Sequence, residues 1–265
     1  MNVVVEKFFK WLPFENVNEL CILCDKRIHD NSDPYLEKTQ EELLEKTLRS
    51  EIYKEFPTHP EFRCAFFKKL VKLFEKYDGV EINEDIYRAV VLNEEDLESN
   101  QTFYKSYFQN DGTYLCSLIE TKEFVIKGTT GLKTWPAAEF LLEMFFKGSK
   151  LQEDNTLLEL GSGIGMIGIS LLRCGKVNKF IFTDHSESVL EVVKQNLHKN
   201  GIHNEDSFDV QKLDWEDDKT EVPNHDLVFG SDIVFDQRII PSLVRTLKNC
   251  LKKSKKPAIV ANVER

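Results

Sequence analysis

The stretch that decides the fold is Leu157-Leu158-Glu159-Leu160-Gly161-Ser162-Gly163-Ile164-Gly165. The apolar residues ahead of Gly161 predict a buried strand, and the apolar run from Met166 to Leu172 predicts a helix directly after the glycines. Glycines in such a turn let the backbone bend tightly and let a nucleotide-like ligand lie against main-chain N–H groups without meeting a Cβ atom. The sequence therefore predicts a strand, a cofactor-binding turn and a helix.

The spacing of the glycines is compatible with two kinds of cofactor. Residues 163–168 match G-x-G-x-x-G, the fingerprint of dinucleotide-binding turns, which favours a nicotinamide-dependent oxidoreductase. In the other frame Glu159 stands two places before Gly161, which resembles the first motif of S-adenosylmethionine-dependent methyltransferases. S-adenosylmethionine carries a sulfonium cation and no phosphate, so an acidic side chain near the turn suits it better than it suits a pyrophosphate. We favour the second frame and keep the oxidoreductase as the alternative function.

Further strands along the chain also carry acids at or near their ends. These strands and acids are residues 179–184 with Asp184, residues 208–215 with Asp214, and the nearly all-apolar run 226–235 with Asp232. Because the carboxyl ends of parallel strands meet at one edge of a sheet, we expect these acids and Glu159 to face one crevice. A single acid at a strand end is more often a turn or cap residue, so the prediction depends on the whole set.

Two of these acids have a predicted partner on a nucleoside. Asp184 is placed to accept hydrogen bonds from both hydroxyls of a ribose. Asp214 offers a carboxylate to the adenine amine, and Trp215 offers a ring to the edge or face of the base. Between the second and third strands, residues 188–200 have the apolar spacing of a helix, and Gly201 stands where a C-terminal cap belongs.

Several motifs together resemble a known family. The segment 128–138 reads GTTGLKTWPAA, and it is followed by LELGSGIG at 158–165, FTD at 182–184, LDW at 213–215 and GSDIVFD at 230–236. This set resembles the seven-β-strand lysine methyltransferases of methyltransferase family 16, and the resemblance covers most of the chain. It implies a Rossmann-like α/β sheet, S-adenosylmethionine as the cofactor, and transfer of a methyl group to the lysine of a protein.

The resemblance also implies particular site residues. It implies contacts to S-adenosylmethionine from Trp135, Gly161, Ser162, Gly163, Trp215 and Ser231, which join Glu159, Asp184 and Asp214 from the strand pattern. Ser231 stands where relatives usually carry alanine, a small-for-small exchange that preserves the contact. The segment around Trp135 is most similar to family members that methylate elongation factor 2, so the resemblance implies elongation factor 2 as the substrate.

Methyl transfer to lysine requires a neutral amine, and lysine is protonated at neutral pH, with an ordinary pKa of about 10.4. A carboxylate near the amine can accept that proton, and Asp232 is the candidate catalytic residue. Asp236 is a weaker second candidate. A purely structural role of Asp232, in which it holds the next loop, stays open.

The end of the chain limits the expected sheet. Residues 257–265 predict the fifth strand, whereas family members continue into a helix and a final pair of strands, in the sheet order 3-2-1-4-5-7-6. We therefore expect a sheet truncated after strand 5, with a bare edge. This expectation favours a third function class, a catalytically impaired cofactor-binding or interaction form.

The first part of the chain has a helical period. We expect residues 1–100 to form a helical N-terminal region and residues 101–265 to form the methyltransferase domain. The expected helices include a longer one over residues 36–52 that ends before Pro57, an aromatic one over residues 62–77 whose apolar face is core, and a weaker one over residues 82–97.

A strand-like period begins after this region. Residues 113–119 and 123–126 alternate well enough to predict a β-hairpin at about 113–127, and Pro136 predicts a helix whose N-terminus lies at Trp135.

Composition excludes several functions. The formal net charge of −10 argues against non-specific binding to nucleic acid or to an anionic membrane. No signal peptide or membrane span is visible in the sequence, so we expect a cytoplasmic protein, and we expect a monomer. The six cysteines are spread over different predicted elements, as expected for reduced thiols. Cys21 and Cys24 form a C-x-x-C motif without a second pair, which disfavours a zinc or redox site. The six histidines lack paired spacing with acids or thiols, so we expect no metal site.

Overall fold

The computed structural model describes residues 3–13, 33–77, 79–92, 96, 102–121, 130–148, 151, 155–254 and 256–264. The chain divides into two compact units, Met1–Ser117 and Leu118–Arg265. The division into domains at residues 1–100 and 101–265 stays a prediction from the sequence. The pair Cys21 and Cys24 and the strand expected at 123–126 lie outside the described residues. None of the helices in the described part of the chain combines the length and the apolar character that a membrane span requires.

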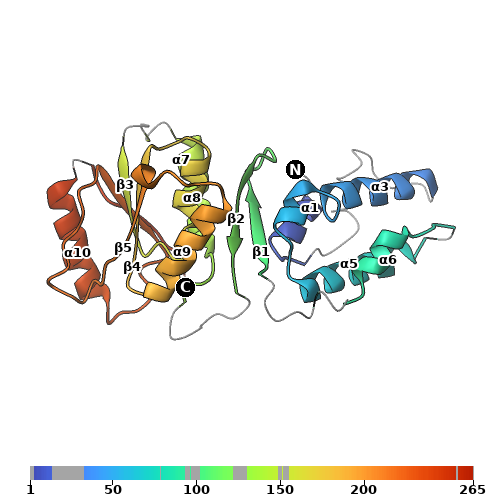
Figure 1. Ribbon diagram of the computed structural model, residues 1–265. Coiled ribbons are helices and arrows are strands. Elements are labelled where there is room, and N and C mark those ends of the chain that lie inside the picture. The colour runs from blue at the N-terminus through green and yellow to red at the C-terminus, as the bar shows by residue number, and fades with distance from the viewer. Residues whose placement is uncertain are drawn as a thin grey trace. The chain divides into compact units, whose positions relative to one another are not determined.

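The first unit contains short helices followed by a pair of strands (Figure 1). Its elements are α1 (Val3–Phe9), α3 (Asp33–Lys46), α4 (Glu51–Glu55), α5 (Pro60–Phe74), α6 (Glu84–Ala89), β1 (Tyr104–Phe108) and β2 (Tyr114–Ile119), the last of which runs into the second unit. The expectation of one longer helix over residues 36–52 is wrong, because the chain turns after α3 and starts again. The Ser50 side chain accepts a hydrogen bond from the Tyr53 N–H and so caps the new helix α4.

The aromatic face of α5 forms the core of this unit, as its spacing predicted. Phe66, Phe67, Leu70 and Phe74 are all buried in one apolar cluster. Phe8 of α1 packs into the same cluster, with ring centroids 5.2 Å from Phe66 and 5.6 Å from Phe67. The stripe is therefore core and not a surface left open for a partner.

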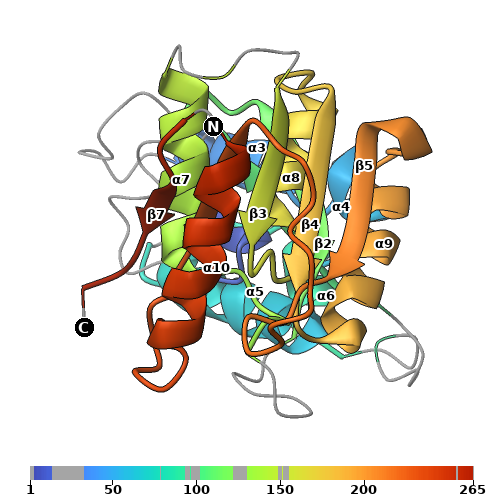
Figure 2. The same cartoon turned by 90° about the vertical axis from the view of Figure 1, so that its left-hand side faces the viewer.

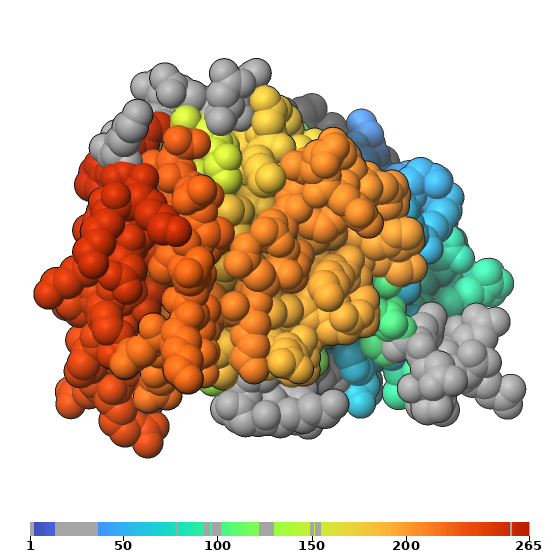
Figure 3. All heavy atoms as spheres, turned by 60° about the vertical axis from the view of Figure 1, so that its left-hand side comes forward, coloured from blue at the N-terminus to red at the C-terminus, as the bar shows by residue number. Residues whose placement is uncertain are grey.

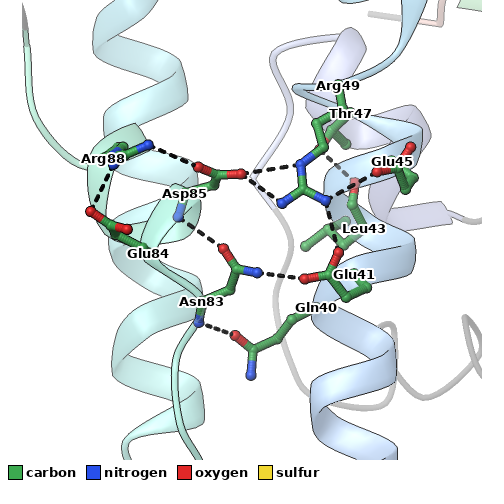
Figure 4. Close-up of polar contacts among 10 residues, drawn as sticks. All are labelled: Gln40, Glu41, Leu43, Glu45, Thr47, Arg49, Asn83, Glu84, Asp85 and Arg88. Atoms are coloured by element: carbon green, nitrogen blue, oxygen red, sulfur yellow. Dashed lines mark hydrogen bonds and ion pairs between the residues drawn. The ribbon is translucent and has the colours of Figure 1, made fainter.

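A polar network ties the end of α3 to α6 within this unit (Figure 4). The Arg49 guanidinium donates to Asp85 Oδ2 from Nη2 at 2.6 Å and from Nε at 3.1 Å. Its Nη1 also contacts Glu41 at 2.7 Å and Glu45 at 3.0 Å. Each pair is partly exposed, so the network fixes orientation more than it contributes to the free energy of unfolding.

The two strands of the first unit form a hairpin, with β1 next to β2. The turn is closed by a hydrogen bond of 2.8 Å from the Gln109 N–H to the Thr113 carbonyl. Ser106 and Ser117 are fully buried and their hydroxyls lie 2.7 Å apart, which satisfies both polar groups in the interior. The sequence expected β2 to pair with residues 123–126, whereas in the described residues it pairs with β1.

The second unit is built on a parallel sheet with the order β5-β4-β3-β6-β7. The strands are β3 (Thr156–Leu160), β4 (Lys179–Asp184), β5 (Phe208–Lys212), β6 (Leu227–Ser231) and β7 (Ile259–Ala261). The connecting elements are α7 (Pro136–Lys147), α8 (Met166–Arg173), α9 (Glu187–Lys199), the short 3₁₀ helix η3 (Glu205–Ser207) and α10 (Ile240–Lys253). In chain order the strands run 3-2-1-4-5, which confirms the Rossmann-like sheet expected from the family resemblance.

Helices cover both faces of this sheet: α10 lies on one face and α7, α8 and α9 lie on the other (Figures 1 and 2). The alternation along β4 explains the two layers. Ile181 points into the cluster that includes Leu243 and Cys250 of α10. Phe180 and Phe182 point to the opposite face, where a Cβ atom on Gly168 of α8 would lie only 2.5 Å and 2.3 Å from their rings. Gly168 therefore lets α8 lie directly on the strand.

The segment between β5 and β6 lies beside α10, as the orange and red surfaces of Figure 3 show. Arg245 of α10 donates to the Trp215 carbonyl at 2.8 Å and pairs with Asp218 at 2.5 Å. At the other end of the helix, Lys253 Nζ donates to the Val222 carbonyl at 2.6 Å. These contacts hold the loop that carries Asp214 and Trp215 against a helix.

Candidate functional site

A cavity of about 330 Å³ opens at the carboxyl end of the sheet of the second unit. All ten residues that the sequence selected as site residues line it: Trp135, Glu159, Gly161, Ser162, Gly163, Asp184, Asp214, Trp215, Ser231 and Asp232. They come from the ends of β3, β4, β5 and β6 and from the segment before α7, and the parallel strand order brings these ends together.

The glycine-rich turn after β3 forms one wall of the cavity. Gly161, Gly163 and Gly165 have φ angles of 66°, 52° and 89°, a left-handed region that favours glycine. A Cβ atom on Gly161 would lie 3.1 Å from the Ile233 side chain and 3.6 Å from the Trp215 ring. A side chain at Gly161 would therefore crowd Ile233 and touch Trp215, which both line the cavity.

Hydrogen bonds lock this turn to the neighbouring strand. The Ser162 N–H donates to the Thr183 carbonyl at 2.8 Å, and the Thr183 N–H donates to Ser162 Oγ at 2.8 Å. The Thr183 hydroxyl donates to the Glu159 carbonyl at 2.6 Å. Because these groups are buried, each bond is costly to lose, and the turn is rigid before any ligand binds.

Glu159 is the most unusual ionisable residue in the cavity. Its side chain is 1% exposed, and its Oε2 atom has no hydrogen-bond partner among the described residues. Burial raises the pKa of Glu159 well above its usual value, and the nearby Asp184 charge acts in the same direction. A buried carboxyl with an unused oxygen is suited to a cationic ligand, which would favour its ionised form.

Asp184 ends β4 and is also largely buried. Its Oδ1 atom accepts a hydrogen bond from the Ser186 N–H at 3.0 Å and lies 3.2 Å from His185 Nδ1. None of the hydrogen bonds among the described residues uses Oδ2. The carboxylate is therefore oriented through one oxygen and keeps the other for a ligand.

His185 lines the cavity but was not singled out from the sequence. The hydrogen bond to Asp184 raises the pKa of His185, although burial acts in the opposite direction. The signal was available, since His185 is the first residue after the strand-end acid. Phe235 also lines the cavity; it lies within the GSDIVFD motif but was not selected as a site residue. Ile239 lines the cavity as well and was missed because it belongs to no motif.

Asp214 and Trp215 follow β5. Asp214 Oδ1 accepts a hydrogen bond of 2.9 Å from the Glu216 N–H, the turn role that any aspartate can play. Its other oxygen takes part in no hydrogen bond among the described residues, so a ligand contact is compatible with the turn. The Trp215 ring lies against the position of Gly161 and closes one side of the cavity.

Trp135 is the N-cap residue of α7, followed by Pro136 in the first turn, as the sequence predicted. Its indole Nε1 donates to the Thr130 carbonyl at 3.3 Å, which curls the segment 130–135 around the ring. Gly131 in this segment lies close to the glycine turn, because a Cβ atom on Gly163 would be 3.1 Å from the Gly131 carbonyl oxygen. The two loops face each other across the cavity.

Ser231 and Asp232 come from the end of β6. Asp232 has a φ angle of 54°, a left-handed conformation that is uncommon outside glycine. Its N–H donates to the Ala261 carbonyl of β7 at 2.7 Å, and the residue is 7% exposed. A conformation of this kind persists only where the surroundings fix it, and such positions cluster at functional sites.

Asp236 differs from Asp232. It lines the cavity, but both of its oxygens bind the Arg238 guanidinium, from Nε at 3.0 Å and Nη2 at 2.6 Å. These bonds lower the pKa of Asp236 to about 2. A carboxylate with such a low pKa is a weak base, so Asp232 is the better candidate for accepting a proton.

The family match decides the class. A family model described as lysine methyltransferase matches residues 118–265, which coincide with the second compact unit. The chain belongs to this lysine methyltransferase family. The resemblance drawn from the sequence motifs is confirmed, and the family of lysine methyltransferases, not of nicotinamide-dependent oxidoreductases, gives the function class.

Relatives of this lysine methyltransferase extend the likeness into the first unit. The chain is 27% identical over 250 residues to Protein-lysine N-methyltransferase EEF2KMT of Homo sapiens, covering 89% of this chain and 74% of that one. It is 29% identical to the Mus musculus protein of the same name, covering 83% and 69%. It is 33% identical over 141 residues to Protein-lysine N-methyltransferase EFM3 of Chaetomium thermophilum, covering 50% and 42%.

Among solved structures, the chain is similar to Methanocaldococcus jannaschii Trm5 in complex with adenosine. The sequence identity is 13% and the TM-score is 0.39, with 60% of this chain and 42% of that chain covered. The strand order and the family match define the fold of residues 118–265.

Proposed function

We propose that this lysine methyltransferase binds S-adenosylmethionine in the cavity of residues 118–265 and methylates a lysine of elongation factor 2. Two observations support elongation factor 2 as the substrate. The relatives from Homo sapiens and Mus musculus are named Protein-lysine N-methyltransferase EEF2KMT. The segment around Trp135 resembles family members that act on elongation factor 2, and this segment lines the cavity.

The cavity fits S-adenosylmethionine at two points that depend on the described atoms alone. The glycine turn lines the cavity without a Cβ atom at Gly161 or Gly163, so the cofactor can lie against its main-chain groups. The unpartnered Oε2 of Glu159 offers a buried acceptor for the cationic end of the molecule, and this is the observation that carries the proposal. When bound, the cofactor supplies a methyl group activated by its sulfonium.

Other side chains would hold the rest of the cofactor. Asp184, whose Oδ2 takes part in no hydrogen bond within the described part of the chain, would accept hydrogen bonds from the ribose hydroxyls. Asp214 would accept from the adenine amine, and the Trp215 ring would cover the base. Trp135, Ser162 and Ser231 would complete the walls around the methionine part.

The residues of the chain must bring the amine of the substrate lysine into its neutral form, in a site that excludes water. Asp232 would accept the proton of the substrate ammonium, because it is nearly buried, lines the cavity and is held in place through its backbone. Removing bulk water from around the amine also favours its neutral form, since burial disfavours the charge. Phe235 is half exposed beside the same cavity and would cover the apolar stem of the lysine.

Methyl transfer tests the proposal. The chain is incubated with labelled S-adenosylmethionine and a cell extract depleted of the endogenous enzyme, and labelled proteins are identified. We expect label on a lysine of elongation factor 2. We expect Asp232→Asn to lower kcat by about a hundredfold or more while S-adenosylmethionine binding changes little. Label on another protein would discard elongation factor 2 as the substrate and keep the cofactor, and no label on any protein would overturn the activity.

A further inference from the structure

The cavity has two facing walls that are far apart in the sequence, and one buried side chain joins them. One wall is the glycine turn after β3, and the other is the segment 130–135 before α7. Asn196 of α9 is fully buried and does not line the cavity. Its Nδ2 donates to the Ile164 carbonyl of the glycine turn at 3.0 Å, and its Oδ1 accepts from the Ile119 N–H at 2.8 Å.

The residues after Ile119 carry this connection to the second wall. The Glu120 carboxylate is buried, and its Oε2 atom accepts a hydrogen bond from the Thr134 N–H at 3.3 Å. The Thr121 N–H donates to the Leu132 carbonyl, also at 3.3 Å. Thr134 directly precedes Trp135, so the position of the indole depends on where residues 119–121 are held.

One end of the Asn196 amide therefore fixes the Ile164 carbonyl in the glycine turn, which lines the cavity, and the other end fixes the Ile119 N–H, next to the residues that hold the Trp135 segment. We propose that Asn196 is a positioning residue, which sets the spacing between the glycine turn and the Trp135 segment and so determines the affinity for S-adenosylmethionine. The proposal rests on the proposed function for its ligand. The close approach of Gly163 to the Gly131 carbonyl leaves little tolerance in that spacing, since a Cβ atom there would lie at 3.1 Å.

Two variants separate the two ends of the amide. Asn196→Asp keeps an acceptor for the Ile119 N–H but places an oxygen against the Ile164 carbonyl, which breaks only the connection to the glycine turn. Asn196→Leu removes both bonds and leaves two buried backbone groups without partners. Leu197→Ala is the matched control, because Leu197 is 1% exposed on the same helix and does not line the cavity.

The first measurement is the dissociation constant of S-adenosylmethionine for each folded variant. We expect Asn196→Asp and Asn196→Leu to raise it by about tenfold or more, with the KM for the protein substrate changed by less than about twofold. Leu197→Ala is expected to lower the melting temperature by a similar amount and leave the dissociation constant within about twofold of the original. Asn196 variants that fold and bind S-adenosylmethionine as the unchanged chain does would overturn the proposal.

The second measurement is amide hydrogen exchange without any cofactor, which decides the role of Asn196 even if the unchanged chain fails to bind S-adenosylmethionine. We expect Asn196→Leu to accelerate exchange at Ile119, Thr121 and Thr134 together, by about tenfold or more. In Asn196→Asp the Ile119 amide is expected to stay protected. Unchanged exchange at Thr121 and Thr134 in Asn196→Leu, or equal acceleration in Leu197→Ala, would show that Asn196 does not join the two walls.

Discussion

At the scale of single residues, the cavity contains a carboxyl group that the described fold does not satisfy. Glu159 is buried on β3, and its Oε2 finds no partner among the described residues. The hydroxyl groups of Thr183 and Ser162 both donate to the main-chain carbonyl of Glu159, and not to its side chain. A group placed in this way weakens the empty protein and strengthens its complex with a cation.

The pH dependence of stability tests the placement of Glu159. The unfolded chain titrates this group at an ordinary pKa of about 4.3, and burial raises the folded pKa. The unfolded state therefore loses its proton first, and the contribution of Glu159 to stability is lost as the pH rises above that value. Relative to Glu159→Gln, the free energy of unfolding should fall with a slope of up to about 1.4 kcal/mol per pH unit.

Urea unfolding of both proteins measures this slope between about pH 4, near the ordinary pKa of a carboxyl group, and about pH 8. Titrating groups that do not interact with Glu159 cancel in the difference, because the two chains share them. A difference that does not change with pH would mean that Glu159 is solvated and ionised in the folded protein.

His225 gives a second pH dependence of the opposite sign. Its Nδ1 lies 2.8 Å from the Pro223 carbonyl, and its Nε2 is buried without a hydrogen-bond partner among the described residues. Burial lowers the pKa of His225 in the folded protein. Below the unfolded pKa of about 6.5, the imidazole therefore binds a proton in the unfolded chain but stays neutral in the folded chain. The contribution of His225 to the free energy of unfolding is complete above that pH and decreases as the pH falls through it. Chemical unfolding should show this decrease at acidic pH in the original chain and not in His225→Asn. The same decrease in both proteins would exclude His225 as its source.

The residues of the site could be predicted from the sequence to different degrees. Glu159, Asp184 and Asp214 stand at strand ends, and a strand end is a local feature of the pattern. Asn196 could not be found in this way, because its partners Ile119 and Ile164 are 77 and 32 residues away in the sequence. A tertiary contact of a polar residue on a helix leaves no periodic signal.

At the scale of elements, the unit of β3, the glycine turn and α8 depends on the close packing of a helix on a strand. Gly168 belongs to the G-x-G-x-x-G match that suggested a dinucleotide, but its position explains it without any ligand. It lies against Phe180 and Phe182 of β4, on the face away from α10. The glycine is needed for packing, which is why the match alone could not identify the cofactor.

Gly168→Ala tests this packing. The added Cβ atom would lie 2.3 Å from the Phe182 ring, so the ring or the helix must move. We expect a loss of about 1–3 kcal/mol in the free energy of unfolding, measured by chemical denaturation. The control is Gly175→Ala, where a Cβ atom meets nothing within 4 Å although the φ angle is 61°. Gly168→Ala with a smaller loss than the control would contradict the close packing.

In the first unit, α5 is tied down by a buried ion pair. Arg63 Nη1 and Nη2 donate to the two oxygens of Asp96 at 2.8 Å and 2.7 Å, and both side chains are about a tenth exposed. Arg63→Met removes one partner and leaves a buried carboxylate, so we expect a loss of about 3–5 kcal/mol in unfolding free energy. The double variant Arg63→Met with Asp96→Leu should recover part of that loss. Equal stability of the single variant and the original chain would show that the pair is solvated.

Elements were predictable where one period continues between clear start and stop signals. The strands β3, β4 and β6 and the helices α7 and α9 have such signals. The break between α3 and α4 was missed because the apolar period continues through it, and the Ser50 cap starts a new helix inside the pattern. The pairing of β2 with β1 was not predicted, because alternation marks a strand but not the strand next to it.

At the scale of the whole molecule, the central feature is that the strand order of residues 118–265 turns separate acids into one site. The strand order places β4, β3 and β6 in the middle of the sheet, and the carboxyl ends of the parallel strands share one edge. The order itself followed from the family resemblance and not from the periodicity. The acids could then be placed together before the structure showed their distances.

Thermal unfolding with added ligands tests this account most directly. The melting temperature of the full chain is measured with S-adenosylmethionine, S-adenosylhomocysteine and NAD, and repeated with Asp184→Asn. We expect the two adenosyl compounds to stabilise the folded state by about 2.7 kcal/mol at a hundred times their dissociation constants, and NAD to have no effect. Asp184→Asn should need about a hundredfold more ligand for the same shift, because it weakens the ribose contact. Stabilisation by NAD alone, or by none of the three, would contradict the assignment of this cavity to S-adenosylmethionine.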